Sequence, residues 1–283
     1  MIILFLSPFI IQQLVQRSLE EDMGMAGDIT SAAIFAGATP PTVKAAIRAR
    51  QHGVIAGIEF AMSAFTQLDS TININLACHD GKKVKSGDIL LEIQGKATSI
   101  LAAERVALNF LTHLSGIATT TQQMCVLLEG TKAKLCCTRK TIPGLRAAQK
   151  YAVRMGGGSN QRFGLFDAVL IKDNHIAAAG SITAALTAIR HHLGHMVKAE
   201  IEVDTMDQVK EAIAMGAEIL LLDNMSPAQL IEAVQWIDNR AITEASGRVR
   251  PDNIQAIAAS GVDYISAGWI THSAPALDIA LDL

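Results

Sequence analysis

Charged and polar side chains follow a series of short apolar runs in the second half of the chain. The runs cover residues 135–138, 168–171, 199–203, 218–222, 241–245 and 263–267. At or just after their ends stand Arg139, Lys140, Lys172, Glu202, Asp223, Ser246, Gly247 and Gly268. Arginine binds carboxylates through a planar fork, and lysine offers a compact charge for phosphate. The pattern predicts one site for an anionic substrate, provided that the fold brings the run ends together.

Acidic residues succeed the basic ones along the chain. Residues 138–175 contain seven Lys and Arg against two Asp and Glu, whereas residues 176–283 contain six against fourteen. Carboxylates at two neighbouring strand ends can hold Mg²⁺ when substrate phosphates supply further ligands. We therefore predict a Mg²⁺ or ribose role for Glu202 and Asp223. The sequence leaves the roles of Glu200 and Asp204 undecided.

Small residues follow the last two runs, in the segments EASG (244–247) and ISAGWITHS (265–273). A helix is predicted to begin near Thr271 to Ser273. Loops after the last strands of a barrel, together with a helix N-terminus, commonly bind phosphate through free backbone N–H groups. Gly247 and Gly268 fit that role, and His272 can add a hydrogen bond.

Helical stretches lie between the apolar runs and open with capping residues such as Ser181, Thr205 and Ser226. Strands and helices alternate at intervals of roughly 20–30 residues, which predicts βα units and a parallel sheet. In a (β/α) barrel the C-terminal strand ends converge on one mouth. Because only about six or seven strands are evident, the expected fold is an open (β/α) barrel.

The chain before residue 117 has a different pattern, with short strands and Gly or Asp-Gly turns. Strands are predicted within 43–50, 53–60, 71–81 and 82–95, followed by a helix over 103–116. The expected class is thus α/β, with an N-terminal α+β sandwich domain over residues 1–116 and the open barrel over 117–270. Residues 271–283 are expected to pack back on the first domain.

The composition excludes several classes of protein. Half of the residues are hydrophobic, 18% are charged and the net charge is −3, which excludes a disordered chain and gives no basic excess for nucleic acid or an anionic membrane. Residues 1–11 are apolar but lack a basic leader and a cleavage site, so a helix beginning at Ser7 and Pro8 is expected instead of a signal peptide. Four cysteines without a C-x-x-C pair suit a reducing compartment and predict a cytoplasmic protein.

A long ordered series of motifs resembles the quinolinate phosphoribosyltransferases, the decarboxylating nicotinate-nucleotide pyrophosphorylases of NAD biosynthesis. The motifs include EEDMGMAGDITS (20–31), AERVALNFLTHLSGIAT (103–119), TRKTIPGLR (138–146), YAVRMGGGSNQR (151–162), DAVLIKDNH (167–175), EIEVD (200–204) and LLDNM (221–225). The resemblance covers nearly the whole chain. It implies a sandwich domain, an open barrel, Mg²⁺, the substrates quinolinate and phosphoribosyl pyrophosphate, and a homodimer with shared active sites, with a hexamer as the alternative assembly.

The matching motifs imply roles for individual residues. Quinolinate would be bound by Thr138, Arg139, Gln161, Arg162 and Lys172, together with Arg105 from the partner subunit. The pyrophosphate, metal and ribose of the donor would be bound by Lys140, Glu202 and Asp223, and its 5′-phosphate by Ser246, Gly247, Gly268 and His272. The candidate catalytic residues are Lys140, Lys172, Glu202 and Asp223, and no general base is assigned.

Three positions depart from the family pattern. Cys137 stands where the family usually has Asp. Gln161 takes the place of the His in the usual N-H-R motif, and Arg248 stands where a second glycine is frequent. Gln161 keeps hydrogen-bonding capacity but cannot carry charge. Arg248 is expected to alter phosphate contacts.

Two other functions compete with the quinolinate assignment. A relative with the same scaffold, similar to the molybdenum-transport-associated protein, would act on another heterocyclic acid. The segment VKSGDILLEIQGKAT (84–98) is also similar to the lysine hairpin of lipoyl and biotinyl domains, with Lys96 near the modified position.

Overall fold

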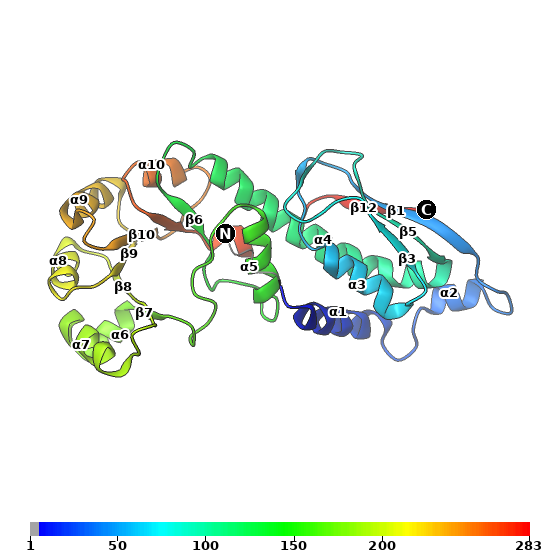
Figure 1. Cartoon of the computed structure of the whole chain (residues 1–283), viewed down its shortest axis with the longest axis horizontal. Coiled ribbons are helices and arrows are strands. Elements are labelled where there is room, and N and C mark those ends of the chain that lie inside the picture. Colours follow the sequence, from blue (N-terminus) through cyan, green and yellow to red (C-terminus); the bar gives the residue numbers. More distant parts are fainter. Residues whose placement is uncertain (1–5) are drawn as a thin grey trace. The chain divides into compact units, whose positions relative to one another are not determined.

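The computed structural model describes residues 6–283 and divides into two compact units (Figure 1). The first unit contains the chain up to residue 122 together with 142–157 and 274–283, and the second contains 123–141 and 158–273. The expected boundary at residues 116 and 117 falls inside helix α4 (Ala97–Val126). Of the apolar segment 1–11, residues 1–5 lie outside the described part of the chain.

The first unit is built on a four-stranded antiparallel sheet with the order β12-β1-β5-β3. Its strands are β1 (Thr42–Ala49), β3 (Asn73–Leu76), β5 (Ile89–Lys96) and β12 (Ile279–Asp282), and a two-stranded sheet joins β2 (Gly53–Val54) to β4 (Lys83–Val84). The helices are α1 (Pro8–Met23), α2 (Ile29–Ile34), α3 (Ile58–Leu68), α4 and α5 (Arg146–Met155). The last residues of the chain therefore form an edge strand of the first unit, against β1.

Two expectations for this unit are wrong in detail. The predicted strand over 53–60 ends after Val54, and α3 begins at Ile58, because Asp80 caps that helix by accepting hydrogen bonds from the backbone N–H groups of Gly57 (2.9 Å) and Ile58 (3.0 Å). The helix predicted to end at residue 116 continues to Val126. A Cβ at Gly116 would collide with the carbonyl group of Pro275, so this glycine permits close packing of the C-terminal segment and does not end the helix.

The segment that resembles a lipoyl hairpin has a different geometry. Lys96 is the last residue of β5, it pairs with Thr42 of β1, and α4 begins directly at Ala97. The lysine is therefore not at the tip of a hairpin turn, where a carrier domain presents its modified side chain.

The second unit is a six-stranded parallel sheet with the order β6-β11-β10-β9-β8-β7. The strands are β6 (Lys134–Cys136), β7 (Val169–Ile171), β8 (Ala199–Val203), β9 (Ile219–Asp223), β10 (Ile242–Ser246) and β11 (Tyr264–Ser266). They coincide closely with the six apolar runs. The edge strands β6 and β7 do not pair with each other among the described residues, so the sheet is an open (β/α) barrel, as predicted.

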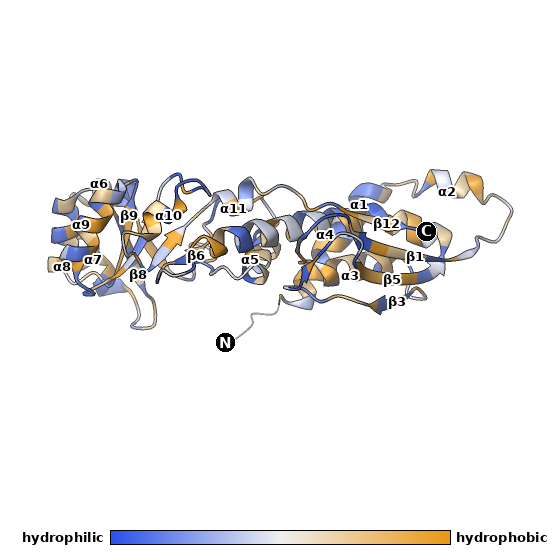
Figure 2. Cartoon of the chain, turned by 90° about the horizontal axis from the view of Figure 1, so that it is seen from above, coloured by the Kyte–Doolittle hydropathy of each residue, from blue (hydrophilic) through white to orange (hydrophobic). Residues whose placement is uncertain are grey.

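Helices α6 (Asp173–Ala179), α7 (Ile182–His192), α8 (Met206–Ala214), α9 (Pro227–Ile237), α10 (Ile254–Ala258) and α11 (Trp269–His272) connect the strands. The side chains of Ser181, Thr205 and Ser226 cap α7, α8 and α9, as predicted from the sequence. Figure 2 shows hydrophobic and hydrophilic residues on each of these three helices, as expected for helices that cover a sheet on one side. No helix within residues 6–283 is long and apolar enough to cross a membrane.

Candidate active site

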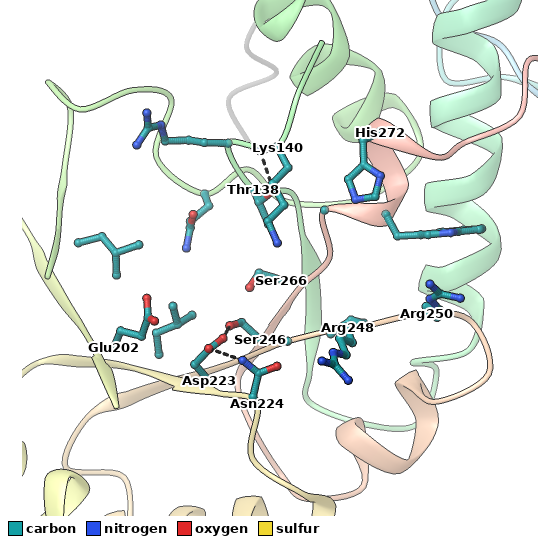
Figure 3. Close-up of a pocket in the computed structure, with 18 of the residues that line it drawn as sticks. Thr138, Lys140, Glu202, Asp223, Asn224, Ser246, Arg248, Arg250, Ser266 and His272 are labelled. Atoms are coloured by element: carbon teal, nitrogen blue, oxygen red, sulfur yellow. Dashed lines mark hydrogen bonds between the residues drawn. The ribbon is translucent and has the colours of Figure 1, made fainter. Parts of the chain in front are cut away.

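A pocket of about 740 Å³ lies at the C-terminal ends of the six parallel strands (Figure 3). Every strand contributes to its lining, either with a residue near its end or with a residue one or two positions after it. Its volume is in the range of small-molecule sites. The predicted residues that line it are Thr138, Arg139, Lys140, Gln161, Arg162, Lys172, Glu202, Asp223, Ser246, Gly247, Gly268 and His272.

Arg105 is the one predicted site residue that does not line this pocket. It lies on α4, in the first unit, and its side chain is exposed. Its predicted role is in the site of a partner subunit, which a single chain does not test.

Asp223 is held by two uncharged donors. It is paired in register with Ser246 of β10, whose hydroxyl donates a hydrogen bond to Oδ1, while Nδ2 of Asn224 donates to Oδ2 at 2.5 Å (Figure 3). Asn224 adopts a left-handed backbone with φ of 53°, which asparagine tolerates better than most residues. The carboxylate is thereby fixed, and within residues 6–283 no ion pair neutralises it.

Glu202 faces the same pocket from β8. Partial burial raises the pKa of Glu202, the negative charge of Asp223 raises it further, and Lys172 acts in the opposite direction. Two carboxylates that repel each other in this way suit a shared cation. Within residues 6–283 no group of three or more His, Cys, Asp or Glu side chains could hold a metal ion. A divalent cation would therefore fit here only if further oxygen ligands came from a substrate or from water.

Arg139 and Arg162 are two of the basic residues that line the pocket. Arg162 donates from Nη1 to the carbonyl of Ala168 at 3.0 Å, which fixes its direction. Burial lowers the pKa of Arg162, and the positive charge of Arg139 lowers it further. Two guanidinium groups held close together favour a ligand with more than one negative charge.

The turn between β11 and α11 supports Lys140. Gly268 lies so close to this side chain that a Cβ would be 2.9 Å from Lys140 Cδ and 3.2 Å from Thr138 Oγ1. Thr271 Oγ1 donates to the carbonyl of Lys140 at 2.7 Å and to that of Gly268 at 2.9 Å. The glycine therefore serves close packing against Lys140 as well as access to the pocket.

The helix after this turn begins earlier than predicted. It spans Trp269–His272, and Ser273 ends it instead of starting it. His272 still lines the pocket, and its Nδ1 lies 2.6 Å from the hydroxyl of Ser273. The sequence prediction failed because a serine between helical and extended residues can precede or follow a helix.

Gln161 links two buried glutamates, Glu200 on β8 and Glu244 on β10, which are the strands on either side of β9. Its Nε2 donates to Oε1 of Glu244 at 2.8 Å and lies 3.3 Å from Oε2 of Glu200. Both glutamates are less than a tenth exposed, and Oε1 of Glu200 has no hydrogen-bond partner among the described residues. The uncharged amide at position 161 therefore faces acidic groups on one side and the pocket on the other.

Glu200 is expected to make the stability of the protein depend on pH. Burial, with the charge of Glu244, raises the pKa of Glu200 from 4.5 to about 8. Between these values the folded chain keeps a proton that the unfolded chain loses, so stability falls as pH rises from about 4.5 to 8, with a slope of up to about 1.4 kcal/mol per pH unit. Glu200→Gln should flatten this dependence.

The test is thermal unfolding of Glu200→Gln and of the exposed control Glu232→Gln between pH 5 and pH 8. The control should retain the slope of the unmodified chain. An unchanged slope in Glu200→Gln would contradict a protonated carboxyl at this position.

The cysteines take no part in the pocket. Cys136 is buried on β6, and burial together with the charge of Glu244 raises the pKa of its thiol well above the usual value. Cys137 is also buried, and its Sγ contacts Oδ1 of Asn160 at 3.2 Å. A thiolate nucleophile is therefore disfavoured at Cys136.

Several lining residues were not predicted from the sequence. Leu170 and Leu221 provide apolar surface, and the other additional residues are Val249, Arg250, Asp252, Asn253, Ser266 and Trp269. Asn224, directly after Asp223, and Arg248, which was expected to alter phosphate contacts, also line the pocket. The segment 249–253 follows the strand by several residues, and only the turn of the chain brings it back to the pocket.

The chain matches the N-terminal domain of quinolinate phosphoribosyl transferase over residues 28–115 and the C-terminal domain over residues 117–282. It is 41% identical to a probable nicotinate-nucleotide pyrophosphorylase [carboxylating] of Bacillus subtilis, covering 96% of this chain and 93% of that protein. It is 38% identical to a quinolinate phosphoribosyltransferase [decarboxylating] of Nicotiana glauca, with coverage of 96% and 82%.

A solved structure supports the same relationship. The nicotinate-nucleotide pyrophosphorylase of Francisella tularensis superposes with a TM-score of 0.93 at 42% identity, covering 99% of this chain and 98% of that one. Sequence and fold therefore agree over both units, and the chain belongs to the quinolinate phosphoribosyltransferase family.

Proposed function

We propose that this protein transfers the phosphoribosyl group of phosphoribosyl pyrophosphate to quinolinate, with loss of CO₂, and so produces nicotinate mononucleotide and pyrophosphate for NAD biosynthesis. The observation that carries this conclusion is one pocket in which two close arginines, two lysines and two carboxylates meet at the ends of six strands. The names of the relatives state the same reaction.

Quinolinate is a flat ring with two adjacent carboxylates. Arg139, Arg162 and Lys172 supply the positive charge for these groups, and Thr138 and Gln161 supply hydrogen bonds. Leu170 and Leu221 offer apolar surface to the ring. Because guanidinium groups bind carboxylates through two parallel hydrogen bonds, they orient the ring as well as bind it.

The donor lies on the other side of the site in this proposal. Lys140 binds its pyrophosphate, Glu202 and Asp223 bind the ribose hydroxyls and a Mg²⁺ ion, and Ser246, Gly247, Gly268 and His272 bind the 5′-phosphate. When bound, Mg²⁺ would neutralise charge on the departing pyrophosphate. The pair of unneutralised carboxylates supports this metal, since oxygen ligands are those that Mg²⁺ prefers.

The reaction needs positioning more than acid–base catalysis. The bond between ribose C1 and the pyrophosphate oxygen breaks, the electron pair leaves with pyrophosphate, and the lone pair of the pyridine nitrogen forms the new bond to C1. The resulting pyridinium then accepts the electrons of the adjacent carboxylate bond as CO₂ leaves, and the ring carbon takes up one proton. The pyridine nitrogen carries no proton, so no general base is required for attack. Catalysis therefore comes from orientation and from the charges around the pocket.

We also propose that the functional assembly is a homodimer with shared sites, in which the partner subunit's Arg105 contributes to quinolinate binding; a hexamer of such dimers is compatible with the same site. The exposed position of Arg105, outside the lining of the pocket in its own chain, supports this arrangement. A cytoplasmic location is proposed on the basis of four cysteines that form no disulfide.

Shared sites predict complementation between two inactive variants. Arg105→Ala and Lys140→Ala should each abolish most activity, but mixed dimers would contain one site free of both changes and regain about a quarter of the activity in a random mixture. The two variants are mixed, unfolded and refolded together so that subunits can exchange, and the turnover of the mixture is then measured. Activity no greater than that of the separate variants would contradict sites shared between subunits.

The substrate is tested by isothermal titration with quinolinate and with nicotinate, which lacks the second carboxylate. Quinolinate should bind at least about tenfold more tightly, since each charge-assisted hydrogen bond contributes roughly 1.5–3 kcal/mol. Equal affinity for the two acids, or turnover of nicotinate in place of quinolinate, would contradict the proposed substrate.

A further inference from the structure

Arg248 has an unusual backbone conformation for its residue type. Its φ is 51°, in the left-handed region that favours glycine. Three other residues besides glycine have positive φ within the described chain, and all of them are Asn or Asp, which tolerate this conformation. Arginine at this position therefore has a strained backbone that glycine would relieve.

The surrounding turn holds this position firmly. Nδ2 of Asn253 donates to the carbonyl of Arg248 at 3.1 Å, and Oδ1 of Asn253 accepts from the N–H of Arg250 at 2.8 Å. On the other side, Gly247 lies so close to Asn224 that a Cβ would collide with it. The conformation of residues 247–250 is thus set by neighbours on both sides.

The side chain of Arg248 faces the pocket. It lines the cavity beside Ser246, on the side of the site that also holds Arg250 and His272 (Figure 3). Its side chain is exposed, and within residues 6–283 it forms neither a salt bridge nor a hydrogen bond through its guanidinium group. A guanidinium held in this way can bind an incoming anion without first breaking an internal ion pair.

The position of Arg248 indicates which anionic group of the substrates it would contact. Arg139 follows β6, Arg162 precedes β7 and Lys172 follows it, and the carboxylates of quinolinate are placed at these three residues. Glu202 and Asp223 stand on β8 and β9. Arg248 comes directly after Gly247 at the end of β10, beside the small residues assigned to the 5′-phosphate. Resting on the proposed function, we infer that Arg248 is a further binding residue of this chain, which grips the phosphomonoester at the 5′ end of the phosphoribosyl group.

The pyrophosphate leaves during the reaction, but the 5′-phosphate is retained in nicotinate mononucleotide. Arg248 should therefore strengthen the binding of donor and product alike, and leave the binding of pyrophosphate unchanged. A general electrostatic effect of one positive charge would instead strengthen the binding of every anion.

The experiment compares Arg248→Gly with Arg248→Gln and with the control Lys210→Gln, which removes one positive charge from the exposed face of α8. Titration calorimetry measures the dissociation constants of ribose 5-phosphate and of inorganic pyrophosphate, and steady-state kinetics measure the KM for phosphoribosyl pyrophosphate and inhibition by nicotinate mononucleotide. Both Arg248 variants should bind ribose 5-phosphate and nicotinate mononucleotide about tenfold more weakly, and the KM for phosphoribosyl pyrophosphate should rise by about the same factor. This is the effect expected for the loss of one charge-assisted hydrogen bond. The dissociation constant of pyrophosphate should change by less than about twofold in both variants. The control Lys210→Gln should bind all of these ligands as the unmodified chain does.

Thermal unfolding separates binding from a structural role. Arg248→Gly should unfold at the same temperature as the unmodified chain or higher, because glycine relieves the positive φ. The inference would be overturned if the Arg248 variants bound ribose 5-phosphate as tightly as the unmodified chain, or if their affinity for pyrophosphate fell as much as their affinity for ribose 5-phosphate. Because ribose 5-phosphate binding is measured without turnover, this result is independent of whether the unmodified chain converts quinolinate, which tests the proposed function.

Discussion

Asp223→Asn is expected to lower kcat/KM by about 10²–10³-fold, the range seen when one preorganised charged or polar group is removed from a transition state. The substitution keeps the size of the side chain but removes the negative charge, and it replaces one of the two oxygens that accept hydrogen bonds from Ser246 and Asn224 with an NH₂ donor. In the proposed mechanism this charge acts on the ribose and the metal while positive charge develops at C1. The loss should therefore appear mainly in kcat, with little change in the quinolinate requirement.

Steady-state kinetics with varied Mg²⁺ measure this effect, and Asp207→Asn provides a matched control. Asp207 is exposed on α8 and pairs with Lys210, so the same chemical change there removes a surface charge only. A kcat/KM of Asp223→Asn within about threefold of the unmodified chain would remove this residue from the reacting centre.

Lys172→Ala is expected to raise the KM for quinolinate by about 10–100-fold, since one charge-assisted hydrogen bond to a carboxylate is lost. Lys172 is exposed at the N-cap of α6, where its backbone N–H donates to Nδ1 of His175 at 2.9 Å. That contact does not involve the lysine side chain. The variant should therefore fold normally, and its thermal midpoint should remain within a few degrees of the unmodified value.

Two further variants are measured beside Lys172→Ala: the conservative variant Lys172→Arg and the surface control Lys210→Ala. The arginine variant keeps the charge and should recover part of the quinolinate affinity, while the surface variant should behave like the unmodified chain. Unchanged quinolinate kinetics in Lys172→Ala would exclude the lysine from the carboxylate site.

The sequence predicted the pocket well because its residues are tied to strand ends. Lys172, Glu202 and Asp223 stand at or directly after buried apolar runs, and in a parallel sheet the C-terminal strand ends lie at one edge. Their positions at the strand ends in the sequence were therefore enough to predict that these residues lie together at one edge of the sheet. The six strands were recognisable because each is a short apolar run, and capping residues open the helices that follow β8 and β9.

Other features depend on contacts that a local pattern does not contain. The start of α3 depends on Asp80, more than twenty residues away, which caps Gly57 and Ile58. The continuation of α4 through Gly116 depends on its packing against the C-terminal segment. Gln161 was predicted to contact substrate, but the sequence could not reveal that its amide also joins Glu200 to Glu244. Tertiary packing decides such positions, and propensity alone does not.

The most direct test of the central claim uses quinolinate labelled in the carboxylate next to the ring nitrogen. The protein is predicted to release labelled CO₂ only when phosphoribosyl pyrophosphate and Mg²⁺ are both present, because decarboxylation requires the pyridinium formed by phosphoribosyl transfer. A label in the other carboxylate should appear in nicotinate mononucleotide. Absence of labelled CO₂ under these conditions, or its release without the donor, would contradict the account.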